Sequence, residues 1–118
     1  MQRVTMKASL FVTGITLALV AGVPRPARAQ DAAAKGAEVY AAQKCGVCHA
    51  IAGKGGKASP LDDVGTKLSA ADTKQWIVEP VAMAAKVGST KKPPMPKKYD
   101  KLPAADVDAL VAYMQSLK

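Results

Sequence analysis

Apolar residues near the end of the chain recur at the spacing of one helix face. They are Val107, Leu110, Val111, Met114 and Leu117, a pattern typical of an amphipathic helix with one buried side. Pro103 suits the first position of such a helix, while Asp106 in the first turn and Lys118 at the end suit the helix dipole. We therefore expect a C-terminal helix that starts at Pro103.

A second helix is expected over residues 32–43, with Asp31 as its N-cap. Gly36 and Tyr40 lie four positions apart and therefore share one face of this helix. A helix with one small and one large core residue would have the same pattern. We favour a close crossing, in which Gly36 lets the C-terminal helix approach, because that helix offers a matching apolar face.

Two shorter helices are expected in the middle of the chain. Ser69 and Asp72 approximate a capping box for a helix over residues 70–79, which Pro80 ends. A short helix over residues 81–87 follows and stops at Gly88. The glycine-rich residues 53–57 are expected to form a loop. No segment alternates as a strand does, so the expected fold class is all-α.

The first 29 residues are expected to be a cleaved secretory signal peptide. A basic start precedes an apolar run over residues 8–23, and Ala27-x-Ala29 fits cleavage before Gln30. The run is shorter than the ~20 residues that a spanning helix needs. We therefore expect residues 30–118 to form one exported, periplasmic domain without stable membrane insertion. The alternative is a membrane anchor that stays uncleaved.

The basic residues of the chain bear on whether it binds nucleic acid. The whole chain has a formal net charge of +8, but four of its basic residues belong to the expected signal peptide. All the basic residues that remain are lysines, without arginines or interleaved aromatic residues. That composition argues against nucleic-acid binding, which favours bidentate arginines and stacking side chains.

The strongest chemical signal is Cys45-Gly-Val-Cys48-His49. Two cysteines two residues apart, followed by histidine, predict covalent attachment of one haem c, with both thiols forming thioethers and His49 binding the iron. A redox dithiol, a structural disulfide and half a zinc site are the alternatives. A zinc site needs four ligands, and the chain has no second cysteine pair and no other histidine.

A sixth iron ligand is expected from Met95. It stands between prolines in Pro93-Pro94-Met95-Pro96, a segment that cannot be helical. Prolines reduce the conformations of a free loop, so they favour a weak iron–thioether bond. Met114 is more simply a core residue, and Met83 is expected to pack over the haem. Two protein ligands leave no iron position for a substrate, which predicts an electron carrier and not an enzyme.

These features together resemble the class I c-type cytochromes, which are small bacterial monohaem electron carriers. The resemblance rests on Cys45-x-x-Cys48-His49, on Pro94-Met95-Pro96 and on the final helix, and it covers essentially the whole of residues 30–118. It implies three to five helices wrapped round one haem, and attachment by a cytochrome c maturation machinery. It also implies crossed terminal helices, with Gly36 and Tyr40 against Leu110 and Tyr113.

The chain departs from the family in the segment after the haem motif. The family usually has Pro-x-Leu there, and its proline carbonyl accepts the N–H of the haem histidine; this chain has Ser59-Pro60-Leu61. The acceptor is then the carbonyl of Ser59 or that of Pro60. Pro60, Trp76 and Tyr113 are the expected haem-pocket residues. Trp76 is either plain core or a donor to a buried haem propionate.

Lysines surround the expected Met95 loop. They are Lys91, Lys92, Lys97, Lys98 and Lys101. A solvated charge run is one interpretation; the other is a positive surface that steers transient docking onto acidic redox proteins. We expect a free carrier between a quinol-oxidising complex and a terminal oxidase or reductase, with no small-molecule substrate. The alternatives are a haem subunit of a multi-subunit oxidoreductase and a gas-binding or peroxidatic haem protein.

Overall fold

The computed structural model describes residues 22, 24 and 26–118, so most of the expected signal peptide lies outside the described residues. The elements, in chain order, are α1 (Ala27–Ala42), η1 (Cys45–Val47), β1 (Ala50–Ile51), β2 (Lys54–Gly55), α2 (Val64–Lys67), α3 (Ala70–Val78), α4 (Pro80–Lys86), η2 (Tyr99–Lys101) and α5 (Ala104–Ser116). Helices dominate this part of the chain, and the all-α prediction is confirmed.

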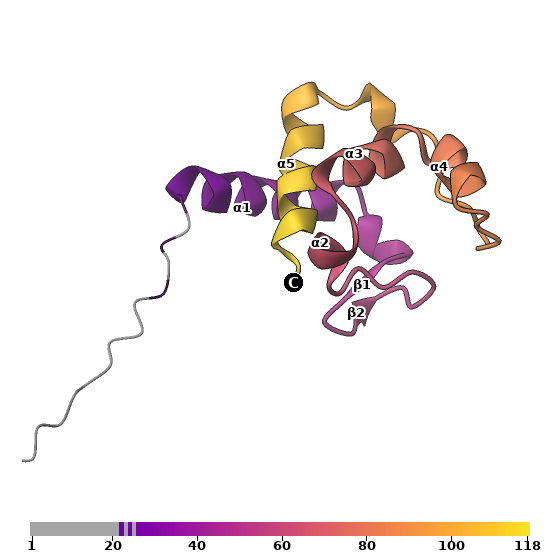
Figure 1. Cartoon of the computed structure of the whole chain (residues 1–118), viewed down its shortest axis with the longest axis horizontal. Coiled ribbons are helices and arrows are strands. Elements are labelled where there is room, and N and C mark those ends of the chain that lie inside the picture. The colour runs from indigo at the N-terminus through magenta and orange to yellow at the C-terminus, as the bar shows by residue number, and fades with distance from the viewer. Residues whose placement is uncertain (1–21, 23, 25) are drawn as a thin grey trace, which may run out of the picture.

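The two long helices, α1 and α5, cross each other (Figure 1). Gly36 is buried at the crossing, and a Cβ atom built on it would overlap the carbonyl of Ala109 and lie 2.6 Å from Cβ of Tyr113. Any larger side chain at position 36 would therefore push the helices apart. The crossing predicted from Gly36 and Tyr40 is confirmed.

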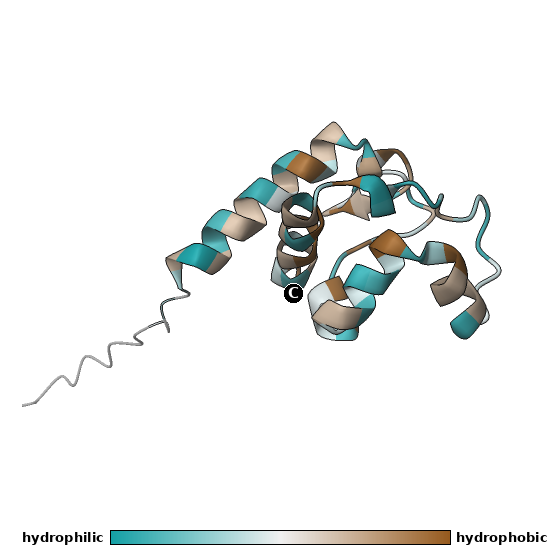
Figure 2. Ribbon diagram, turned by 90° about the horizontal axis from the view of Figure 1, so that it is seen from above, coloured by the Kyte–Doolittle hydropathy of each residue, from teal (hydrophilic) through white to brown (hydrophobic). Residues whose placement is uncertain are grey.

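The core lies where α5 meets α1, α3 and η2. Its buried members are Val39, Ile77, Tyr99, Val107 and Leu110. Figure 2 shows hydrophilic and weakly hydrophobic bands alternating along the outer turns of α1, and a strongly hydrophobic band where the helix meets the rest of the domain. The apolar stripe read from the sequence of the last helix is thus the face that closes this core.

The start of α1 differs from the prediction. The helix begins at Ala27, after Pro26, and has no side-chain cap; Asp31 lies inside the helix and is not its N-cap. Alanine is the best helix former, and the alanines around Asp31 extend the helix toward the N-terminus. The expected cleavage point after Ala29 therefore falls in the first turn of α1.

The middle helices follow the sequence more closely. Ser69 accepts a hydrogen bond from the amide of Asp72 at 3.0 Å, as the predicted capping box requires. Helix α3 ends at Val78, and α4 starts one residue earlier than expected, with Pro80 in its first turn. Gly88 follows α4 with φ of +63°, an angle that glycine adopts at little cost.

The expected loop over residues 53–57 contains one strand of a minimal hairpin. Ala50 pairs with Gly55 and Ile51 with Lys54 in antiparallel register. Two residue pairs are too few to give the alternating pattern by which a strand is found in a sequence.

Among the described residues, no helix is long and apolar enough to cross a membrane.

Candidate functional site

One cavity of about 920 Å³ brings together the residues that the sequence singled out for chemistry. Cys45, Cys48, His49 and Met95 all line it. Its walls come from the loop after the haem motif, from α3 and α4, from the proline-rich segment and from α5. The volume lies near the upper end of the ~300–1,000 Å³ typical of cofactor sites.

His49 is oriented by a hydrogen bond from its ring. Nδ1 lies 2.8 Å from the carbonyl oxygen of Ser59. A carbonyl only accepts, so Nδ1 carries a proton and donates it, and in the neutral imidazole Nε2 is then the nitrogen available to a metal. Of the two acceptors that the sequence left open, the structure selects Ser59 and not Pro60.

The backbone of His49 is held as well. The Tyr40 hydroxyl, which comes from α1, donates to the His49 carbonyl at 3.0 Å. Burial, more than the nearby Cys45 and Tyr113, raises the pKa of Tyr40 to about 12, so the hydroxyl keeps its proton at neutral pH. Tyr40 was expected only as a helix-crossing residue, and its link to His49 was not foreseen.

Two glycines of the hairpin press against the haem motif. The amide of Gly56 donates to the Gly46 carbonyl at 2.8 Å. A Cβ atom on Gly56 would overlap the Val47 carbonyl and lie 2.8 Å from the Cys48 backbone. A Cβ on Gly55 would overlap the carbonyl of His49. The run of glycines was the only sequence signal for this close approach.

The two cysteines are presented by a tight turn. The amides of Cys48 and His49 both donate to the Cys45 carbonyl, at 3.2 and 3.0 Å. Cys45 is half-buried and Cys48 is exposed. Burial raises the pKa of the Cys45 thiol. The turn brings both sulfur atoms to the same cavity, as attachment to one porphyrin edge requires.

The methionines differ in their relation to the cavity. Met95 is half-buried, lines the cavity and packs against the core. Met114 is buried, as expected, and also lines the cavity. Met83 is buried but is not on the cavity wall, so its expected packing over the haem finds no support. Met95 is the methionine that combines the cavity wall with a loop unable to form a helix.

The expected pocket residues fall into two groups. Trp76 and Pro60 line the cavity. Tyr113 does not: it packs edge-on against Tyr40, with ring centroids 5.7 Å apart and planes inclined by 75°. The structure therefore places Tyr113 behind Tyr40, at the helix crossing, and Tyr40 is the ring that reaches the cavity wall.

The five lysines of the expected docking surface are in different environments. Lys91, Lys92 and Lys98 line the cavity. Lys97 is paired with Glu79 at 2.9 Å, and this hydrogen bond raises the pKa of the lysine. Lys101 is exposed at the end of η2. The described residues that line the cavity include no aspartate or glutamate, so its charged side chains are all basic.

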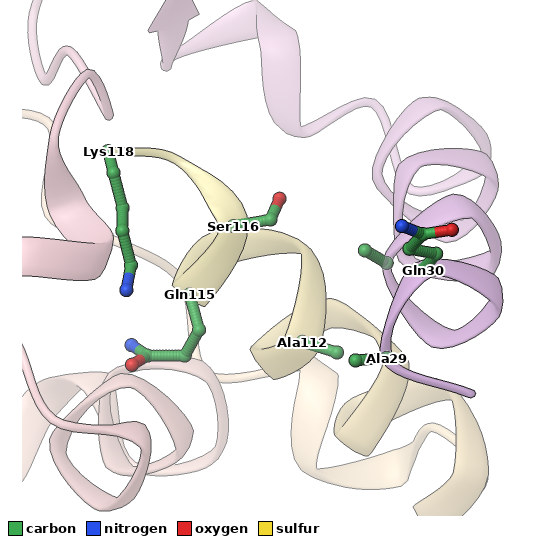
Figure 3. A pocket seen from close by; sticks show the side chains of 7 residues that line it. Ala29, Gln30, Ala112, Gln115, Ser116 and Lys118 are labelled. Carbon is green, nitrogen blue, oxygen red and sulfur yellow. The ribbon is translucent and has the colours of Figure 1, made fainter. Parts of the chain in front are cut away.

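A second, smaller pocket of about 430 Å³ lies between the start of α1 and the end of α5 (Figure 3). Ala29, Gln30 and Ala112 form part of its wall, with Gln115, Ser116 and Lys118. The described residues that line it include no cysteine, histidine, aspartate or glutamate. It also lies apart from the residues of the haem motif, and we assign it no chemistry.

The donor set of the large cavity fits a covalently bound haem. Two thiols lie at its edge, an oriented imidazole follows them, and much of the wall is apolar, as a porphyrin requires. Among the described residues, no three His, Cys, Asp or Glu side chains gather into a group that could hold a bare metal ion.

Comparison with known proteins gives the same family. The family model described as Cytochrome c matches residues 33–118, which include the motif, the proline-rich segment and α5. No curated protein and no solved structure matches the chain significantly. The chain belongs to the cytochrome c family, and its cofactor is a covalently attached c-type haem whose iron serves electron transfer.

Proposed function

We propose that this protein is an exported carrier of single electrons, with His49 and Met95 as the two axial ligands of one haem. The observation that supports it most is that both residues line the cavity that also contains both cysteines. Bound haem supplies an iron that gains and loses one electron. We further propose that the protein is not an enzyme, because two side-chain ligands leave no open coordination position.

The residues of the chain have separate tasks in this proposal. Cys45 and Cys48 fix the cofactor to the chain. Ser59 keeps the His49 imidazole in the tautomer that binds metal. The apolar wall keeps water away from the site, and a thioether ligand such as Met95 raises the reduction potential relative to a second histidine.

The test is an optical spectrum of the reduced holoprotein before and after addition of carbon monoxide. We expect no change in the wild type, because Met95 occupies the sixth position. Met95→Ala removes the thioether and is expected to bind carbon monoxide with a shifted Soret band. Met114→Leu, which replaces the other cavity methionine at similar volume, is the matched control and should stay closed. Ready binding of carbon monoxide by the wild-type protein would contradict the proposed role as an electron carrier with a closed iron site.

We also propose that partners dock at the basic mouth of the cavity, through acidic surfaces. The support is that Lys92 and Lys98 line the cavity, whereas none of its described lining residues is an aspartate or glutamate. Reduction of an acidic redox protein is expected to slow about tenfold between low and physiological salt. Lys92→Gln should weaken this dependence, whereas Lys54→Gln, in the hairpin and not on the cavity wall, should not. A rate that is independent of salt contradicts steering.

Export and cleavage remain part of the proposal. Secretion followed by mass measurement of the mature protein tests both. A mature chain that starts at Gln30 supports the proposed periplasmic carrier, whereas a full-length chain in the membrane fraction supports the anchored alternative.

A further inference from the structure

Two loops face each other across the mouth of the large cavity. The first includes Ala58 and Ser59, and the second includes Lys91, Lys92 and Met95; all five residues line the cavity. More than thirty positions separate the loops in the sequence, yet one side-chain hydrogen bond joins them: Lys91 Nζ donates to the carbonyl of Ala58 at 2.9 Å.

The bond ends beside the group that orients the haem histidine. Ala58 is followed by Ser59, whose carbonyl accepts the His49 Nδ1 proton at 2.8 Å. The carbonyl that accepts from Lys91 and the carbonyl that accepts from His49 thus belong to consecutive residues. A lysine on the methionine side of the cavity therefore acts on the loop that positions the histidine.

The Met95 segment is anchored at two points by lysine side chains. Lys91 holds it before Met95 through Ala58, and Lys97 holds it after Met95 through its ion pair with Glu79 at 2.9 Å. The prolines between these points limit the shapes of the segment. They do not fix its distance from the other wall, because a stiff segment without anchors moves as one piece.

We infer that Lys91 is a positioning residue that ties the two ligand loops together, rather than a docking charge. The inference rests on the proposed His49 and Met95 ligation. Its neighbour Lys92 also lines the cavity mouth and is exposed. In the described part of the chain, Lys92 makes no side-chain hydrogen bond of this kind. Lys91 and Lys92 therefore carry the same charge, but only Lys91 makes the hydrogen bond to Ala58.

The experiment compares Lys91→Met with Lys92→Met in the holoprotein. Methionine keeps most of the length and apolar stem of lysine but cannot donate. In the reduced protein, solvent exchange of the His49 Nδ1 proton, followed by NMR, is expected to be about fivefold faster in Lys91→Met. Carbon monoxide binding should accelerate by a similar factor. Lys92→Met should match the wild type in both, and Lys91→Arg, which still donates, should restore most of the protection.

Equal effects in the two methionine variants would overturn the inference, because loss of charge alone would then explain them. Unchanged proton exchange in Lys91→Met would overturn it as well. A failure of the proposed ligation looks different: the wild type itself would bind carbon monoxide quickly. In that case the exchange rate of the His49 Nδ1 proton still tests whether Lys91 ties the loops, because the bond from His49 to Ser59 does not involve Met95.

Discussion

The two sides of the cavity position their ligands by different means. On the His49 side, the His49 imidazole donates to the Ser59 carbonyl, which orients the ring. The Tyr40 hydroxyl donates to the His49 carbonyl, and the Gly56 amide donates to the Gly46 carbonyl, and these two bonds hold the backbone around the ring. On the Met95 side, no backbone–backbone hydrogen bond forms between residues 90 and 98 within the described chain. That segment depends on prolines and on its lysine anchors.

The difference shows that a strong ligand and a weak one need different support. The histidine must present one nitrogen in one tautomer, which only directed hydrogen bonds can specify. The methionine sulfur has no proton to place, so reducing the freedom of its loop is enough. We expect substitutions on the His49 side to change stability most, and substitutions on the Met95 side to change mainly access to the iron.

The largest expected effect comes from Gly56→Ala. The added methyl would overlap the Val47 carbonyl and press on the Cys48 backbone; backbone atoms cannot rotate away, so we expect a loss of about 3 kcal/mol in unfolding free energy. Denaturant titration of the holoprotein measures it. Gly46→Ala is the control, because its Cβ would meet only Tyr40, at 3.8 Å. Equal losses in both variants would show that the hairpin does not brace the motif.

A medium effect is expected from Tyr40→Phe. Removing the hydroxyl leaves the His49 carbonyl without this donor, which costs about 1 kcal/mol at neutral pH. Tyr113→Phe is the matched control, because it keeps the ring pair but changes a hydroxyl with no bond to His49. A similar loss in both variants would mean that the effect does not come from the hydrogen bond to His49.

The same variant has a predicted pH dependence. The folded pKa of Tyr40, about 12, lies above the ordinary 10.0, so the folded state retains the proton that the unfolded state releases. The wild-type advantage over Tyr40→Phe is then complete below pH 10 and declines as the pH rises toward 12. Unfolding curves of both proteins across this range check the sign; a widening difference would contradict it.

The smallest effect is expected from Pro96→Ala, on the methionine side. Restoring freedom to the unfolded chain should cost about 0.5 kcal/mol. The variant should bind carbon monoxide slightly faster while the exchange of the His49 Nδ1 proton stays unchanged. A change in the exchange rate of that proton would mean that the two sides of the cavity are coupled through the prolines and not through Lys91.

The sequence predicted those parts of the molecule that follow from a local pattern. The haem motif, the apolar stripe of α5, the Ser69 cap and the Gly36 crossing are examples. Each depends on residues within one element or on a glycine that has few other uses there. Membership of the cytochrome c family confirms the cofactor that the motif predicted.

Contacts between distant segments could not be read in the same way. Whether Ser59 or Pro60 accepts from His49 depends on the path of a loop, and the Tyr40 hydroxyl reaches the His49 carbonyl because the turn around η1 brings the chain back toward the end of α1. Helix spacing gives the face on which Tyr113 lies, but it does not show that the Tyr40 ring, which meets it edge-on, reaches the cavity wall instead.

The crossing at Gly36 also sets an order of assembly. Its partner Ala109 lies roughly 70 residues further along the chain, so closing this contact carries a large loop entropy and requires α5. During synthesis the haem motif emerges long before α5, which supplies Leu110 and Met114 to the cavity. Until α5 packs against α1, the cavity lacks the wall to which Leu110 and Met114 contribute, and the arrival of the last helix closes it.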